Sequence, residues 1–248
     1  MTTEEFSNAF DTLLSSHTIN ATFGEGSSKG EVVLDEYEKS LFLTKAQEYL
    51  VISLYNGKNS SGDSFESTEE LRRYLANIVA EATLSPDTTS DKKPIGIESR
   101  SRFFTLPTDL WFITYESVST EGTGCSKKDN MRVYPVRQDE YQVIKDNPFR
   151  GVNTRRALRL DLADGVVEII SNLNISKYYI RYIKKLTPII LTDLPEGLTI
   201  GNDTINTIEG NKETNCMLHE ALHQKILELA VRMALQSRGY TAQKTQQT

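Results

Sequence analysis

The chain has 248 residues, of which 38% are hydrophobic and 25% charged, and its net charge is −6. This length allows one large domain or two small ones, and the composition is typical of a soluble, mildly acidic protein. General attraction to nucleic acid is not expected, because phosphate binding needs positive surface. No apolar run approaches the roughly 20 residues of a membrane span, and the acidic start predicts no secretory leader.

The N-terminal third predicts helices separated by polar loops. Thr2 and Glu5 match a capping box, and apolar side chains follow them at helical spacing. We expect this helix to end before residues 17–28, a polar and glycine-containing stretch that predicts a loop. Asp35 and Glu38 form a second capping pair ahead of a long amphipathic helix.

The long helix is expected to end at Gly57, because an Asn-Gly pair readily adopts the left-handed conformation that terminates helices. A third helix is predicted from the pair Ser67 and Glu70 to Pro86, since apolar residues recur at helical spacing between them. Residues 86–101 then predict a flexible connector.

Period-two patterning takes over after this connector and predicts strands. Residues 111–115 alternate, and a second strand at 131–136 follows a polar stretch that predicts a long hairpin loop. Residues 138–145 predict a short helix. The strongest β signal covers 158–170, where alternating leucines lead into an Asp-Gly turn and a returning strand.

Another strand is predicted over Tyr178–Ile183, and residues 186–191 predict an extended segment because proline disfavours helix in its predecessor. Residues 197–215 predict a loop. The last element is a helix from about Met217 to Arg238, and the polar residues 241–248 predict a disordered tail.

Helices, then strands, then one more helix indicate the α+β class, not βαβ alternation. We predict that residues 1–85 and 205–240 form one discontinuous domain, a bundle of the N-terminal helices with the C-terminal helix. Residues 100–200 would form a β-rich insertion. Such a bundle would bury the wide apolar faces of its helices.

The chemistry-bearing residues are sparse. Cys125 and Cys216 are isolated and predict free thiols in a reducing, intracellular assembly environment. Arg155, Arg156 and Arg159 form a local basic cluster, which we interpret as solvated strand-end charges in preference to a phosphate site. The sequence contains no glycine-rich nucleotide-binding loop, and we predict no catalytic residue and no cofactor.

The string His219-Glu220-Ala221-Leu222-His223 matches the His-Glu-x-x-His motif of zinc proteases. There, two histidines on one helix face bind the metal, and the glutamate polarises the bound water. The predicted terminal helix would supply this geometry. A catalytic zinc needs a third protein ligand, however, and the chain has only three histidines, of which His17 lies in the N-terminal segment.

A helical projection offers a simpler explanation for His219 and His223. At 100° per residue both lie on the shoulder of a wide apolar stripe, which predicts packing or interface contacts and no metal site. A Cys-His-His cluster that recruits Cys216 would lack a fourth ligand. A zinc metallopeptidase is the alternative.

Three stretches together resemble a virion protein family: Val33–Gln47, Tyr179–Leu191 and Cys216–Ile226. They are similar to the ring proteins of the head-to-tail connector in crAss-like and related short-tailed bacteriophages. In that family the last helix commonly begins with Cys-x-Leu-x-Glu-x-Leu-His, which would make the zinc-protease string a coincidence.

The resemblance implies a structural virion protein without enzymatic activity. It implies a ring, a dodecamer of copies of this chain, that contacts the portal protein and other tail or ring proteins. The ring would bridge the capsid portal to the tail and line the DNA ejection channel, with only non-specific proximity to genomic DNA. Assembly would take place in the bacterial cytoplasm without a membrane partner. Another tail-associated or capsid-associated binding module is a further alternative.

A ring needs heterologous interfaces that close on rotation. Tyr178, Tyr179 and Tyr182 with Arg181 are residue types enriched at interfaces, although they are also compatible with an ordinary strand inside one subunit. Together with His219 and His223, they are the predicted interface residues.

Overall fold

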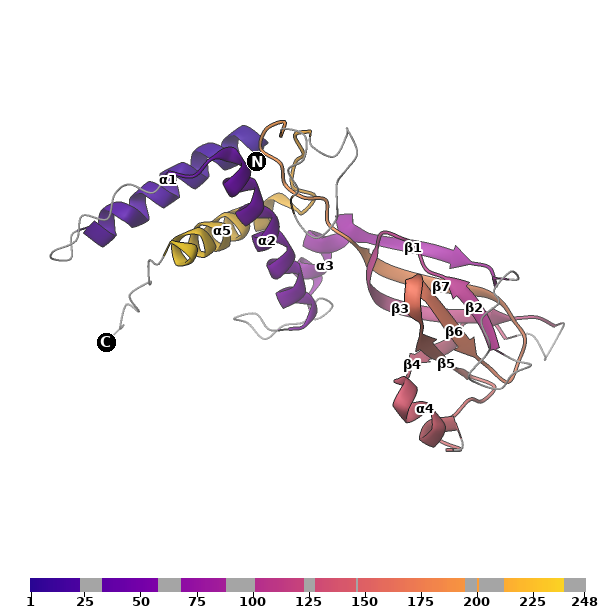
Figure 1. Cartoon of the computed structure of the whole chain (residues 1–248). Coiled ribbons are helices and arrows are strands. Elements are labelled where there is room, and N and C mark those ends of the chain that lie inside the picture. Colours follow the sequence, from indigo (N-terminus) through magenta and orange to yellow (C-terminus); the bar gives the residue numbers. More distant parts are fainter. Residues whose placement is uncertain are drawn as a thin grey trace. The chain divides into compact units, whose positions relative to one another are not determined.

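The computed structural model describes residues 1–22, 33–57, 68–87, 101–122, 128–145, 147–194, 200 and 212–238. The chain forms two compact units, which we call the helical unit (Met1–Ile78 with Leu186–Thr248) and the sheet unit (Val79–Lys185). The helical unit carries α1 (Thr3–Thr22), α2 (Glu36–Tyr55), α3 (Glu69–Leu75) and α5 (His223–Ser237) (Figure 1). The sheet unit carries α4 (Gln138–Lys145) and seven strands. The expected mixture of helices and strands is confirmed.

Local capping signals determine where α1 and α2 begin. The Thr2 amide donates to Glu5 Oε2 at 2.9 Å while the Glu5 amide donates to Thr2 Oγ1 at 3.2 Å, as in a capping box. The Glu38 amide donates to the Asp35 carboxylate at 2.7 Å. Gly57 follows α2 with φ of +65°, so the expected start and end of this helix are confirmed.

The predicted end of the first helix is wrong. We expected a loop from residue 17, but α1 continues to Thr22. The residues between His17 and Thr22 include no glycine or proline, so nothing in them breaks the helix. Residues 23–28 lie outside the described part of the chain.

The predicted third helix is wrong beyond its first two turns. Thr68 caps α3 by accepting a hydrogen bond from the Leu71 amide at 3.3 Å, and a 3₁₀ turn follows over Ala76–Ile78. Val79–Leu84 is then a strand, β1, that pairs antiparallel with β7. The apolar residues fit both periods over so short a stretch, and pairing with a neighbouring strand decided between them.

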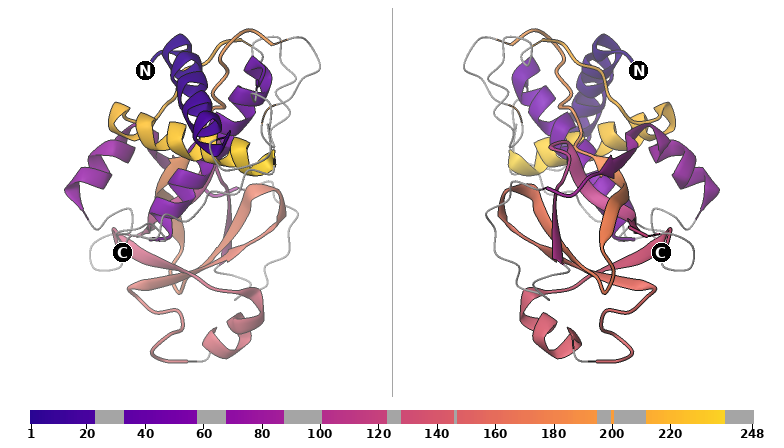
Figure 2. Two further views of the ribbon diagram at one scale, coloured as in Figure 1. Left: turned by 90° about the vertical axis from the view of Figure 1, so that its left-hand side faces the viewer. Right: turned by 90° about the vertical axis from the view of Figure 1, so that its right-hand side faces the viewer.

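The helix α5 buries one face against both α1 and α2 (Figure 2). Its core residues are Ile226, Leu227, Ala230, Val231 and Ala234. They recur at the three- and four-residue spacing of an apolar helix face.

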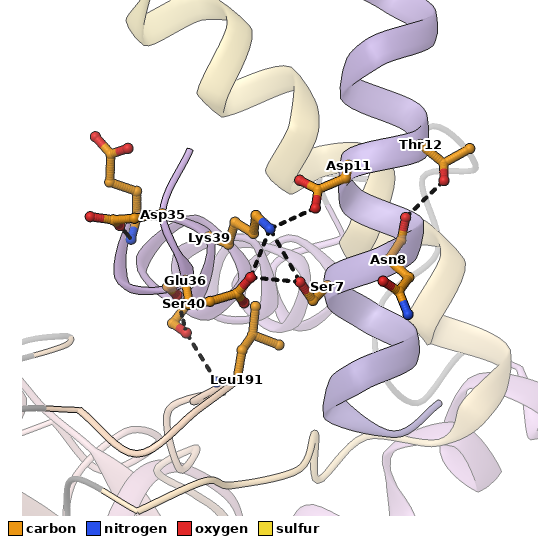
Figure 3. Close-up of polar contacts among 10 residues, drawn as sticks. Ser7, Asn8, Asp11, Thr12, Asp35, Glu36, Lys39, Ser40 and Leu191 are labelled. Atoms are coloured by element: carbon orange, nitrogen blue, oxygen red, sulfur yellow. Dashed lines mark hydrogen bonds and ion pairs between the residues drawn. The ribbon is translucent and has the colours of Figure 1, made fainter. Parts of the chain in front are cut away.

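Lys39 joins α1 to α2 (Figure 3). Its ammonium group is buried and donates to Asp11 at 2.7 Å, to Glu36 at 2.8 Å and to Ser7 Oγ at 3.2 Å. Burial alone would lower the pKa of Lys39, but the hydrogen bonds to Asp11 and Glu36 outweigh it and raise the pKa. The lysine therefore stays charged and holds the two helices together through its carboxylate partners.

Side chains of α2 also bind an extended segment, residues 187–191. The amide of Leu191 donates to Ser40 Oγ at 3.0 Å, and the amide of Ile189 donates to Thr44 Oγ1 at 3.0 Å. Gln47 Nε2 donates to the carbonyl of Thr187 at 3.0 Å. These contacts place main chain, and not a further helix, against this face of α2, so the expected helical bundle is not confirmed.

The sheet unit contains one seven-stranded sheet with the order β1-β7-β3-β4-β5-β6-β2. Its remaining strands are β2 (Ser101–Thr105), β3 (Leu110–Thr120), β4 (Met131–Pro135), β5 (Arg156–Asp161), β6 (Val166–Ile170) and β7 (Ile175–Lys184). All pairs are antiparallel except β4 with β5. The β2 strand was not expected, because it begins in the predicted connector, of which residues 88–100 lie outside the described part.

The sheet curls round its own core. Phe104 on the edge strand β2 and Tyr178 on β7 have ring centroids 5.3 Å apart, although β2 and β7 are five steps apart in the sheet. In a flat sheet five steps would span about 24 Å. The interior residues include Val118, Met131, Val133 and Ile169. A second, smaller core under α4 contains Tyr141, Leu158, Leu160 and Ile170.

The turn between β5 and β6 generates a first prediction. Asp164 and Gly165 have φ of +60° and +68°, as both central residues of a type I′ turn require. We expect Gly165→Val to lower the free energy of unfolding by about 1–2 kcal/mol, because a branched side chain is strained there. Gly165→Asn should cost clearly less, since asparagine tolerates this region. Equal losses in chemical denaturation of the two variants would contradict the turn.

The contact between α2 and the extended segment generates a second prediction. Thr44→Val keeps the shape of this buried side chain but leaves the Ile189 amide without its acceptor. An unsatisfied buried donor costs about 1–3 kcal/mol, which we expect as the loss in unfolding free energy. The exposed Thr83→Val on β1 is the control and should change stability by less than about 0.5 kcal/mol.

Candidate functional site

His219 is not part of the terminal helix, contrary to the sequence prediction. Its backbone is extended, with φ of −61° and ψ of +144°, and it caps a 3₁₀ turn over Glu220–Leu222. Its Nδ1 accepts a hydrogen bond from the Ala221 amide at 3.2 Å, and its exposed ring stacks on Tyr74 at 5.0 Å between centroids. The regular helix α5 begins only at His223, so the two histidines do not share a helix face.

His223 is buried, with 5% of its surface exposed, and both ring nitrogens have partners. Nε2 lies 3.0 Å from the Leu218 carbonyl and Nδ1 lies 3.0 Å from the Met1 nitrogen. The Phe6 ring packs on the imidazole at 5.1 Å. Burial lowers the pKa of His223, so the neutral ring acts as a hydrogen-bonded core residue between α1 and α5.

Neither the glutamate of the zinc-protease string nor the nearby Cys216 forms a metal site with these histidines. Glu220 is exposed, and the Cys216 thiol donates to Gln47 Oε1 at 3.1 Å. Burial raises the pKa of Cys216 to about 11, so this free thiol stays protonated. Within the described ranges, no three His, Cys, Asp or Glu side chains are grouped so that they could hold a metal ion. Cys125 lies outside these ranges.

The tyrosines of β7 separate onto the two faces of the sheet. Tyr178 and Tyr182 are buried in the interior of the curled sheet, where the Tyr182 hydroxyl donates to Asp109 at 3.0 Å. Tyr179 is half-buried and Arg181 is exposed on the opposite face. Alternation along the strand therefore leaves Tyr179 and Arg181 as the members of this predicted set that a second molecule could reach.

An ion pair with little exposed surface holds the Tyr178 hydroxyl. Arg159 Nη1 and the Tyr178 hydroxyl donate to Glu116 Oε2 at 2.8 and 2.7 Å. Burial raises the pKa of Glu116 against the opposing pull of Arg159, and burial followed by the Glu116 charge raises the pKa of Tyr178. These residues come from β3, β5 and β7, so the network links β5 to the neighbouring pair β3 and β7, with which β5 is not paired. Their sequence spacing gave no signal of it.

Comparison with known proteins gives consistent results over nearly the whole chain. A family model described as phage tail ring protein 3/4 matches residues 1–246. Ring protein 3 of Bacteroides phage crAss001 is 44% identical over 241 residues, which cover 96% of each chain. Ring protein 4/5 of the same phage is 29% identical over 245 residues, covering 94% of this chain and 92% of that protein. None of the helices in the described ranges combines the length and apolarity needed to cross a bilayer.

The state of His223 generates a third prediction. Its pKa is lowered in the folded protein, so below its unfolded value of about 6.5 the unfolded chain binds a proton that the folded chain does not. This protonation therefore does not reduce the unfolding free energy above this pH, but it lowers the unfolding free energy as the pH falls below it. His223→Gln should flatten the fall in unfolding free energy between pH 7 and 5.5, measured by urea denaturation. The control His219→Gln should retain most of the wild-type slope, because His219 is the weakest of the causes that shift the pKa of His223. A wild-type slope in His223→Gln would refute the assignment.

Proposed function

The chain belongs to the phage tail ring protein 3/4 family, and on that basis we propose that it forms a ring in the connector between capsid portal and tail. The ring is a homo-oligomer, a dodecamer, that contacts the portal protein and other tail or ring proteins. It bridges the two structures and lines the channel for DNA ejection. It is assembled in the cytoplasm of the bacterial host.

The observation that carries this proposal is the 44% identity to Ring protein 3, which extends over 96% of both chains. The identity includes both units, so the protein as a whole is a structural ring protein of a crAss-like phage. The earlier resemblance, based on three stretches of sequence, is confirmed at the level of the family.

We also propose that the two compact units act as separate domains of the ring subunit. Two chain crossings connect them, at Ile78–Val79 and Lys185–Leu186. The domain boundaries expected from the sequence were residues 1–85 with 205–240 and residues 100–200. Pairing of β1 with β7 favours a boundary at Val79, because β1 belongs to the sheet.

The accessible candidates for contacts between subunits are Tyr179, Arg181 and His219. An aromatic side chain and an arginine, side by side on an outer face, are typical of residues that contribute strongly to protein interfaces. The metallopeptidase alternative loses its geometric basis, because His219 has extended backbone and both nitrogens of His223 have partners.

Cryo-EM of intact virions tests the proposed function. We expect density for this chain as a closed ring between portal and tail, and a copy number equal to that of the portal in quantitative mass spectrometry. Density on fibres or on the capsid surface, or a copy number unrelated to the portal, would refute the connector assignment. Absence from purified virions would refute it as well.

A further inference from the structure

We infer that the outer face of β4 and β5 carries a phosphate-binding site formed by Arg132, Arg155 and Arg156 around Tyr134. The phosphate is that of a DNA backbone, and this source rests on the proposed function, since a ring that lines the ejection channel lies next to DNA. The site itself rests on strand register, charge and shape.

Strand register places two arginines side by side. The parallel pairing of β4 with β5 sets Arg132 directly opposite Arg156, and like charges in this position repel each other. No carboxylate contacts either guanidinium among the ion pairs of the described residues. A bound anion would remove this repulsion.

Tyr134 gives these arginines a neutral partner that cannot balance their charge. The Arg156 guanidinium lies over the Tyr134 ring, 4.7 Å from its centroid. A hydrogen bond from Arg132, and then the charges of both arginines, lower the pKa of the Tyr134 hydroxyl. Both arginines therefore place positive charge beside an exposed phenol, and this positive charge would attract an anion.

A hollow is present at this place, with a volume of about 430 Å³. It is lined by Arg132, Tyr134, Asn153, Thr154, Arg155 and Arg156, and no acidic residue lines it. A tight turn shapes one wall, since the Asn153 amide donates to the Arg156 carbonyl at 3.1 Å and the reverse bond measures 3.3 Å. Arg155 lies exposed in this turn. The Arg156 Nη1 also donates to the Phe149 carbonyl, which fixes its guanidinium.

Arg159, the third member of the basic cluster in the sequence, is not part of this site. It belongs to the interior of the sheet and pairs with Glu116 at 2.8 Å and with Asp161 at 2.9 Å. Its charge is therefore already balanced. Arg132 takes its place in the outer cluster, through a strand pairing that the sequence alone does not show.

The charge of the chain is unevenly divided between its units. The sheet unit has 17 Lys and Arg against 14 Asp and Glu, whereas the helical unit has 11 against 20. The net charge of −6 thus conceals a sheet unit that is positive. A polyanion would be attracted to the sheet unit, and most strongly where arginines gather without carboxylates.

The chemistry favours phosphate over other anions. Arginine is always charged, and its planar guanidinium donates two parallel hydrogen bonds that fit a phosphate group. Three arginines around one hollow can contact neighbouring oxygens of a phosphodiester backbone. Free inorganic phosphate shares this chemistry, whereas the carboxylates of a neighbouring subunit would be a different partner.

Fluorescence anisotropy with a labelled duplex DNA and the purified full-length protein tests the site. We expect Arg132→Gln/Arg155→Gln/Arg156→Gln to weaken binding at least tenfold at low salt. Each lost phosphate contact should reduce the slope of log K against log[salt] by about 0.9. The matched control is Lys177→Gln/Lys184→Gln/Lys185→Gln on and beside β7, which removes the same charge from the same unit and should retain most of the affinity. All six side chains lie at least partly at the surface, and equal thermal unfolding midpoints verify folding.

A second arm separates the sources of the anion. Phenylglyoxal modifies accessible arginines, and mass spectrometry reports whether duplex DNA, inorganic phosphate or polyglutamate protects Arg132, Arg155 and Arg156. Protection by DNA supports the site with its proposed source, and protection by inorganic phosphate alone supports the site with a small-molecule source. Equal protection by polyglutamate would overturn the proposal in favour of a carboxylate partner.

Equal DNA affinity of the wild type, the arginine variant and the lysine variant would also overturn it. These assays use purified protein, so their failure is distinct from a failure of the connector assignment. A virion map that places the chain outside the connector would leave the phosphate site intact and remove only the channel as the source of the DNA.

Discussion

The packing of the helical unit depends on the hydrogen bonds that α2 makes to residues 187–191, the segment that follows β7. Residues 187–191 pass against α2 without forming a helix or a regular strand, so their buried amides need acceptors from elsewhere. Ser40 and Thr44 supply those acceptors, and Gln47 binds both the Thr187 carbonyl and the Cys216 thiol. Three polar side chains at positions i, i+4 and i+7 of one helix thus satisfy main-chain groups that a neighbouring strand would otherwise satisfy. These hydrogen bonds explain why polar residues occupy a buried face of α2.

The charged groups inside each unit are likewise held by hydrogen bonds from other elements. Lys39 lies between Asp11 and Glu36, and Glu116 lies between Arg159 and Tyr178. Each network joins elements distant in sequence, and each keeps its buried ion hydrogen-bonded, which burial requires. A network that needs correctly placed partners favours one arrangement of strands or helices over near alternatives. If the chain forms the proposed ring of identical copies, each subunit must present the same surface to its neighbours, and a single well-defined arrangement is then an advantage.

Sequence reasoning succeeded where the cause of the structure is local. The capping box at Thr2 and the Asp-Gly turn before β6 are set by residues within a few positions, so the pattern identifies them directly. It failed at Val79–Leu84, where pairing with β7 overrides helical spacing. It also could not find that Arg132 lies opposite Arg156, because parallel register is set by the fold. Arg156 and Arg159 lie three positions apart on β5, so the alternation of side chains along a strand places them on opposite faces.

The zinc-protease string shows how one backbone angle decides the meaning of a motif. The motif requires both histidines on one helix, but ψ of +144° at His219 delays the helix until His223. The first imidazole then serves as a cap and stacks on Tyr74, while the second is buried beside Phe6. A five-residue match carries less information than 44% identity over an alignment that covers 96% of both chains. The contacts of the two imidazole rings show that each histidine has a structural role here, so the match lacks the metal-binding geometry that gives the motif its chemistry.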